Sequence, residues 1–194
     1  MVVLGNWLTR WAVALLWLAW LVYWGIAARG TKETARHESI GSRMSYVLPT
    51  LVAGWLLASA APHWPALSER FVPRTPVIFW IGVAVLAAGL AFAVWARRHL
   101  GSNWSGTVTL KRDHSLVRTG PYGWVRHPIY TGLLLAFIGT AITMGTWRAL
   151  LATAILAASL IRKLHIEEQW MRELFKDEYV RYAAQVPALI PLVY

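Results

Sequence analysis

Five stretches of this chain are apolar and free of formal charge, and they restrict its fold more than any other feature. A helix that crosses the roughly 30 Å hydrocarbon layer of a bilayer needs about 20 apolar residues. Of the 194 residues, 57% are hydrophobic and only 14% are charged, which is too apolar for a typical soluble domain. The sequence therefore predicts an all-α integral membrane protein with five transmembrane helices, at Trp11–Ala28, Met44–Ala61, Thr75–Ala96, Pro128–Trp147 and Ala149–Ile161.

Three of these runs have features that qualify the prediction. A signal peptide is an alternative for the first run, because Arg10 precedes it and small residues follow it, but its length and tryptophan content favour a permanent helix. Pro49 predicts a kink in the second helix. The fifth run is short and ends at Arg162 and Lys163, so we expect it to tilt or to extend these side chains toward the membrane surface.

Lys and Arg are distributed unevenly between the predicted loops. Fifteen of the nineteen follow the first, third or fifth helix, whereas the other side holds Arg10, Arg70, Arg74 and Arg148. Because positively charged loops stay in the cytoplasm, this predicts an N-out, C-in, multi-pass protein. Its polar half faces the cytoplasm, at the inner membrane if the source is prokaryotic. Topology then accounts for the net charge of +10 without a nucleic acid partner.

The residue types also exclude several kinds of chemistry. With no cysteine in the chain, there is no disulfide, thiolate nucleophile or cysteine-ligated metal, and no His pair at i, i+4 indicates a zinc site. We therefore expect no metal. The polar residues gather in 97–127 and from Arg162 onward. This organisation predicts a single membrane domain, 1–194, in which three N-terminal helices (1–96) precede a half that carries the chemistry (97–194).

The connector 97–127 is too long for an ordinary loop. It contains aromatic and branched side chains, which favour a folded lid over a disordered linker. His127 and Pro128 then begin the fourth helix, whose first N–H groups could hold a carboxylate. The alternative is that His127 only caps this helix and that Tyr130 is an aromatic residue of the membrane interface.

The C-terminal stretch places one acidic residue on an apolar helical face. Spacings of i, i+4, i+7, i+8 and i+11 align Lys163, Glu167, Trp170, Met171 and Leu174. Glu167 is therefore expected to be more buried than Glu168, which turns about 100° away toward Arg172. The alternative is an exposed ion pair between Lys163 and Glu167, which would stabilise the helix by only a few tenths of a kcal/mol.

Two segments together resemble a known family. "GPYGWVRHPIYTG" at 120–132 and "EEQWMRELFKDEYVRYAAQVPALIP" at 167–191 are similar to the isoprenylcysteine carboxyl methyltransferases, integral membrane enzymes that use S-adenosylmethionine. The resemblance runs from about Leu100 to Pro191. It implies a methyltransferase-like catalytic half at 97–194, which moves a methyl group to a lipophilic acceptor, most simply the carboxylate of a prenylcysteine-like substrate.

The resemblance also implies the site residues. The family's cofactor positions correspond here to Thr109, His114, Ser115, Leu116, Val117, Tyr122, His127, Pro128, Ile129, Tyr130 and Glu167. The family places a substrate-holding arginine where this chain has Lys163, which cannot make a bidentate fork. We expect Lys163, helped by Arg162 or Arg126, to orient the acceptor, with Lys163, Glu167 and Arg126 as the catalytic set. Lys176 stands where the family commonly has glycine.

Other functions remain open at this level. A carboxylate acceptor needs no general base, whereas an amine acceptor would require Glu167 or His127 as the base, and phospholipid N-methyltransferases resemble the same pattern. A small thiol is a further acceptor. Sterol reductases that use NADPH share the His-Pro element but typically have Asn where this chain has Ile129. A non-catalytic scaffold is the remaining alternative. We expect a lipophilic acceptor to enter sideways from the bilayer, with its head at the cytoplasmic rim.

Overall fold

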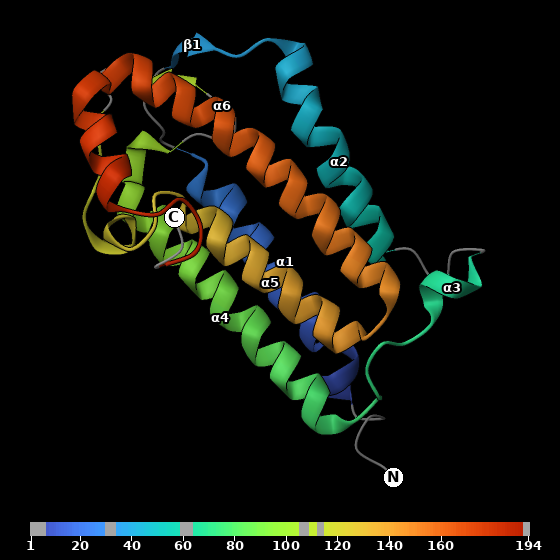
Figure 1. The fold of residues 1–194 in the computed structure, drawn as a ribbon. Coiled ribbons are helices and arrows are strands. Elements are labelled where there is room, and N and C mark those ends of the chain that lie inside the picture. The colour runs from blue at the N-terminus through green and yellow to red at the C-terminus, as the bar shows by residue number, and fades with distance from the viewer. Residues whose placement is uncertain (1–6, 30–33, 59–63, 105–108, 112–114, 192–194) are drawn as a thin grey trace.

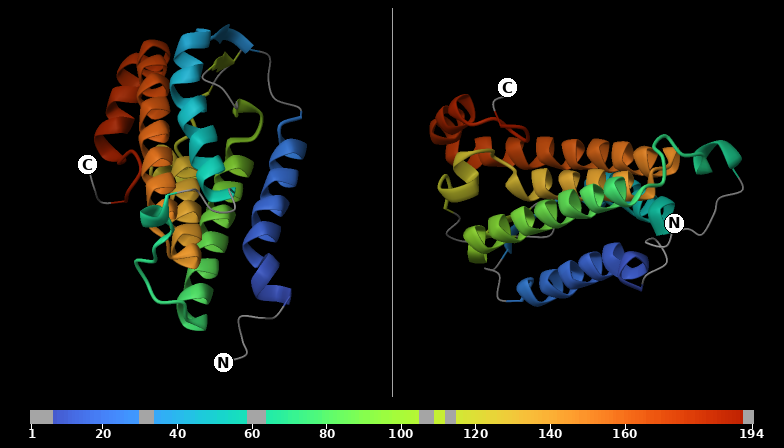
Figure 2. Two further views of the ribbon diagram at one scale, coloured as in Figure 1. Left: turned by 90° about the vertical axis from the view of Figure 1, so that its right-hand side faces the viewer. Right: turned by 90° about the horizontal axis from the view of Figure 1, so that it is seen from below.

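The computed structural model describes residues 7–29, 34–58, 64–104, 109–111 and 115–191. Five long helices run roughly side by side in one bundle, as Figure 1 shows. They are α1 (Trp7–Ala27), α2 (Ile40–Ala58), α4 (Pro76–Leu100), α5 (Pro128–Met144) and α6 (Trp147–Gln185). Two views at right angles show α1 on the far side of α4 from α6, with α2 lying along α6 (Figure 2). The short α3 (Pro65–Ser68) lies between α2 and α4 in the chain.

Helices α4 and α5 pack with their backbones close together because glycines face the neighbouring helix across their interface. A Cβ atom built on Gly139 would lie 2.3 Å from the backbone N of Leu86, and one on Gly89 would lie 2.5 Å from that of Ala136. Small residues let helix backbones approach in this way, which is a common mode of packing in membranes. This pair forms the rigid centre on which the start of α5 is held.

The other helices pack around this pair through apolar side chains. Trp17 and Trp20 of α1 contact the buried cluster formed by Leu86, Leu90 and Ala136. Helix α2 packs on α6 through a second cluster, whose buried members include Ala53, Leu56, Ala152, Leu156 and Leu160. Helices α1 and α2 thus rest on different neighbours.

A helix forms at each of the five predicted runs. The structure also gives the lengths of these helices and shows a break in helical geometry within α6. Two segments, Pro76–Asn103 and Trp147–Gln185, are long and apolar enough to cross a membrane, and the apolar helices Trp11–Ala27 and Pro128–Met144 are shorter. The fifth predicted run, Ala149–Ile161, and the predicted helical face from Lys163 to Leu174 both belong to the 39-residue α6. Helix α6 departs from helical geometry at Lys176, where φ is 44° and ψ is −123°.

The connector between α4 and α5 contains short ordered elements. They are two 3-10 helices, η2 (Gly101–Asn103) and η3 (Gly120–Gly123), and a strand, β2 (Thr109–Lys111). Strand β2 pairs antiparallel with β1 (Thr34–His37), from the segment between α1 and α2. Within the described ranges, the helices and strands of the chain are thus all helices apart from one small two-stranded sheet, a minor correction to the all-α prediction.

Candidate active site

A cavity of about 380 Å³ lies where the connector, the start of α5 and the polar part of α6 meet. Helices α1 and α2 also contribute to its wall, through residues that include Trp20, Trp24 and Tyr46. Nine of the eleven residues expected to hold the cofactor line this cavity: Ser115, Leu116, Val117, Tyr122, His127, Pro128, Ile129, Tyr130 and Glu167. The chain thus brings residues up to 52 positions apart to one place.

The remaining predicted residues are placed as follows. Thr109 lies in β2, where only its backbone is described, and His114 lies outside the described residues. Lys163 and Arg126 line the cavity, whereas Arg162 is exposed on α6 and is not part of the wall. Among the described residues, no group of three or more His, Asp or Glu side chains could hold a metal ion.

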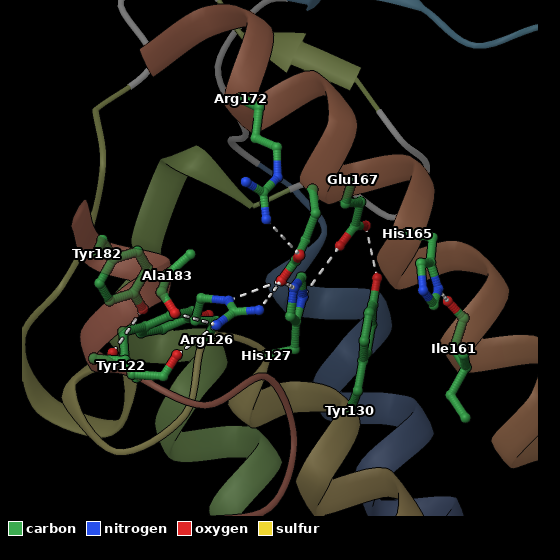
Figure 3. A network of polar contacts seen from close by, with 12 residues as sticks. Tyr122, Arg126, His127, Tyr130, Ile161, His165, Glu167, Arg172, Tyr182 and Ala183 are labelled. Carbon is green, nitrogen blue, oxygen red and sulfur yellow. Dashed lines mark hydrogen bonds and ion pairs between the residues drawn. The ribbon is translucent and has the colours of Figure 1, made fainter. Parts of the chain in front are cut away.

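Glu167 is the centre of the polar wall. The Tyr130 hydroxyl donates a hydrogen bond of 2.6 Å to its Oε1 atom, and its Oε2 atom lies 3.6 Å from Nδ1 of His127 (Figure 3). Lys163 Nζ lies 3.9 Å from Oε1. The Glu167 side chain is 23% exposed and the Lys163 side chain 13%, so this pair is not the exposed i, i+4 bridge of the simpler interpretation.

Lys163 lies between two tyrosine rings. Its Nζ atom is 5.3 Å from the ring centroid of Tyr46 in α2 and 5.6 Å from that of Tyr130 in α5. Ring faces within about 6 Å attract an ammonium group. The side chain is therefore held at the cavity wall by contacts from three helices.

His127 occupies the position before α5 and is bound on several sides. Its ring stacks on that of Tyr130 at 5.4 Å, with 9° between the planes, and its Nε2 atom lies 3.3 Å from Oε1 of Glu168. Burial alone would lower the pKa of His127, but the hydrogen bonds with Glu167 and Glu168 outweigh burial and raise this pKa above its usual value. The geometry favours an imidazolium between two carboxylates.

The expected anion site at the start of α5 is less open than the sequence indicated. The backbone N–H groups of Arg126 and His127 donate to the carbonyl oxygens of Pro187 and Ala188, at 2.9 and 3.0 Å. The Thr131 hydroxyl donates to Leu189, at 2.6 Å. The C-terminal segment 187–189 therefore covers this end of the helix, because its carbonyls satisfy donors that a helix start leaves free.

Glu168 has more partners than the sequence indicated. Its Oε2 atom faces Arg172 as predicted, at 3.8 Å from Nη2, while its Oε1 atom accepts from Nε of Arg126 at 2.8 Å and lies 2.7 Å from Nη2 of the same side chain. Both carboxylates are largely withdrawn from solvent: the Glu168 side chain is 12% exposed, and that of Glu167, which faces the cavity, is 23% exposed. Burial would raise the pKa of Glu168, but hydrogen bonds from His127 and Arg126 outweigh this and lower it to about 2.

Among the wall residues that the sequence did not single out are three tyrosines, Tyr46, Tyr179 and Tyr182. The Tyr182 hydroxyl donates to the Tyr122 carbonyl at 2.6 Å and so fastens the connector to the end of α6. Tyr182 lies in the "YVRYAAQVP" part of the family resemblance, and this was the available signal. Tyr46 had no signal, because its helix offered only apolar periodicity.

Comparison with known proteins agrees with this architecture. The family model described as "Phospholipid methyltransferase" matches residues 77–178, more than half of the chain. The protein belongs to this family of methyltransferases.

Within it, the chain is similar to protein-S-isoprenylcysteine O-methyltransferases. It is 35% identical to the enzyme of Schizosaccharomyces pombe over 48% of this chain and 41% of that protein. It is 28% identical to the Homo sapiens enzyme, over 66% and 47% of the two chains.

A solved structure shows the same relationship. The chain resembles "the eukaryotic intramembrane Ras methyltransferase ICMT (isoprenylcysteine carboxyl methyltransferase)" with a TM-score of 0.53 and 27% sequence identity. The match covers 79% of this chain and 52% of that one. The chain thus spans about half the length of these relatives.

Proposed function

We propose that this protein is a membrane methyltransferase that moves a methyl group from S-adenosylmethionine to the carboxylate of a lipophilic, prenylcysteine-like acceptor. The observation that carries this proposal is the meeting of Glu167, Tyr130, His127 and Lys163 at one cavity wall. These residues come from the part of the chain that resembles the methyltransferases. The named activities of the relatives support the same reaction.

The donor side of the cavity fits S-adenosylmethionine in its chemistry. Glu167 offers a carboxylate to an ammonium group, and the rings of Tyr122 and Tyr130 offer faces to a cation or to a purine. Leu116, Val117 and Ile129 add apolar wall. When bound, the cofactor supplies an electrophilic methyl group. The protein's part is to bind and orient it, and to exclude water.

On the acceptor side, Lys163 is the proposed orienting group. A carboxylate is already ionised at neutral pH, so it attacks without a general base, and a nearby ammonium group holds it by charge. Arg126 is less suited to this role than the sequence indicated, because its guanidinium group already bonds Glu168 and the carbonyl of Ala183. Arg162 is exposed away from the wall.

The proposed setting is a five-span, N-out, C-in arrangement with the cavity at the cytoplasmic side. Large apolar side chains on the outside of the bundle support membrane embedding, among them Leu21, Ile26 and Val77, which are 58%, 60% and 68% exposed. The cavity wall also includes Trp20 of α1 and Leu51 of α2, well inside the apolar helices. An acceptor tail entering from the bilayer would lie along this part of the wall.

A phospholipid amine is the second candidate acceptor, because the matching family model is described as phospholipid methyltransferase. An amine must lose a proton before it attacks, and Glu167 is the carboxylate on the cavity wall that could accept it. Methyl transfer to phosphatidylethanolamine vesicles, and none to an S-prenylated cysteine with a blocked amino group, would favour this candidate.

Calorimetric binding of S-adenosylhomocysteine to the detergent-purified protein tests the function. We expect micromolar affinity, which Glu167→Ala and Tyr130→Ala should each abolish, and no binding of NADPH. Absence of S-adenosylhomocysteine binding by the wild type, or binding of NADPH instead, would overturn the proposal.

A further inference from the structure

The carboxylate of Glu168 joins helix α6 to the end of the connector. Its Oε1 atom lies 2.8 Å from Nε and 2.7 Å from Nη2 of Arg126, and 3.3 Å from Nε2 of His127. Its Oε2 atom lies 3.8 Å from Nη2 of Arg172. One oxygen therefore serves two neighbouring residues of the connector, while the other faces a cation of its own helix.

Glu168 is not part of the cavity wall, although Arg126, His127 and the adjacent Glu167 all are. Any effect of Glu168 on a bound molecule must therefore pass through these neighbours. The His127 ring is the most direct route, because it lies between Glu168 and Glu167 and stacks on Tyr130.

Arg126 is the second route. Its Nη1 atom donates to the carbonyl of Ala183 at 3.0 Å and also to that of Val186, at the end of α6. Its backbone N–H donates to Pro187. The Arg126 and Glu168 side chains are both 12% exposed, so Glu168 is a close counter-charge for a mostly buried guanidinium group. Removing the carboxylate leaves a buried cation at the junction of the connector, α5 and the C-terminal segment.

We propose that Glu168 is a positioning residue: it orients His127 and Arg126 so that Glu167 and Tyr130 are presented to the cavity. The expected effect of Glu168 on cofactor binding rests on the proposed function. The expected effect of Glu168 on His127 depends only on the described contacts. Glu167 and Glu168 face the imidazole from α6, Tyr130 faces it from α5, and Arg126 precedes it in the connector; Arg172 and Tyr179 in turn face Glu168.

The test compares Glu168→Gln and Glu168→Asp with a matched control, Glu178→Gln. Glu178 also joins α6 to the connector by an ion pair, with Arg118 at 3.2 Å, but these side chains are 42% and 50% exposed. Hydrogen bonds to charged, buried groups contribute more to the free energy of folding than exposed ion pairs do. We expect Glu168→Gln to weaken S-adenosylhomocysteine binding by about tenfold or more, Glu168→Asp to restore part of the loss, and the control to stay within about twofold.

The His127 titration, followed by NMR of histidine-labelled protein without ligand, separates positioning from general destabilisation. We expect the His127 pKa to fall in Glu168→Gln and to stay unchanged in Glu178→Gln. An unchanged His127 pKa, or wild-type affinity in Glu168→Gln, would overturn the inference. If the wild type does not bind S-adenosylhomocysteine, the proposed function fails, and the His127 titration still decides the positioning role. Glu168→Asp provides the same titration if Glu168→Gln does not fold.

Discussion

The Tyr130 hydroxyl and the Glu167 carboxylate lie 2.6 Å apart, across the junction of α5 and α6. This bond ties together the two helices that hold the polar cavity wall, since Tyr130 is in the first turn of α5 and Glu167 is 37 residues further along the chain. It also fixes which carboxylate oxygen is directed toward Lys163. The geometry of the candidate site therefore depends on a pair of residues as much as on either one alone.

Removing this hydroxyl should weaken cofactor binding without unfolding the protein. Tyr130→Phe keeps the ring and its stacking on His127 but loses the hydrogen bond to a charged group, typically about 1.5–3 kcal/mol. We expect a loss of S-adenosylhomocysteine affinity of about tenfold or more, measured by calorimetry. Tyr23→Phe is the control, because Tyr23 is outside the cavity wall. Equal affinities for the two variants would contradict the role given to the hydroxyl.

Lys163 should matter for the acceptor more than for the donor. With Lys163→Ala, we expect kcat/KM for an S-prenylated cysteine to fall by about 10–100-fold, the usual range for one buried charged contact, while S-adenosylhomocysteine affinity changes less. Lys163→Arg keeps the charge and should retain more activity. Arg181→Ala removes an exposed cation of the same helix and serves as the control. Full turnover by Lys163→Ala would exclude the orienting role.

The stabilisation supplied by His127 should depend on pH. Its folded pKa is raised from 6.5, so its contribution is complete below pH 6.5 and is lost as the pH rises through the folded value. The pKa of Glu168 is lowered from 4.5 to about 2, so its contribution is complete above pH 4.5 and is lost as the pH falls toward 2.

Thermal unfolding in detergent measures this dependence. The midpoint difference between wild type and His127→Gln should be largest between pH 4.5 and 6.5 and should shrink on either side. A difference that stays constant from pH 5 to pH 9 would show that the imidazolium is not stabilised in the fold.

Lys176 should be a site where glycine stabilises the protein. Its φ of 44° is the only positive value at a non-glycine among the described residues, and side chains other than glycine are strained there. We expect Lys176→Gly to raise the unfolding midpoint by a few degrees, which corresponds to about 1 kcal/mol. Arg181→Gly, in regular helix, should lower it by a similar free energy. A lower midpoint for Lys176→Gly would mean that no strain is relieved.

The close packing of α4 on α5 should make Gly89 intolerant of a side chain. A Cβ atom there would lie 2.5 Å from Ala136 N and 2.6 Å from Gly132 O, both backbone atoms that cannot move independently. We expect Gly89→Ala to destabilise the protein by about 1–3 kcal/mol. Gly54→Ala, where nothing lies within 4 Å, is the control and should be neutral or slightly stabilising. Similar midpoints for both variants would contradict the close helix approach.

The sequence by itself determined the five helical runs, the wall residues from Ser115 to Tyr130, and Glu167. The apolar runs are local features of the sequence, and the residues of the family motif follow one another in a recognisable order along the chain, so both could be found without the structure. The family resemblance also singled out Lys176, but it did not predict the positive φ that the backbone adopts there.

Only the tertiary structure decided how the second carboxylate is used. Arg126 and Glu168 are 42 residues apart, and helical spacing directed Glu168 toward Arg172, one turn away on its own helix. The fold also brings the connector against α6, so Arg126 and His127 reach Glu168, and the C-terminal segment covers the start of α5. Helical spacing predicts which residues of one helix can contact each other. The residue from elsewhere in the chain that compensates a buried charge depends on which elements pack together in the tertiary structure.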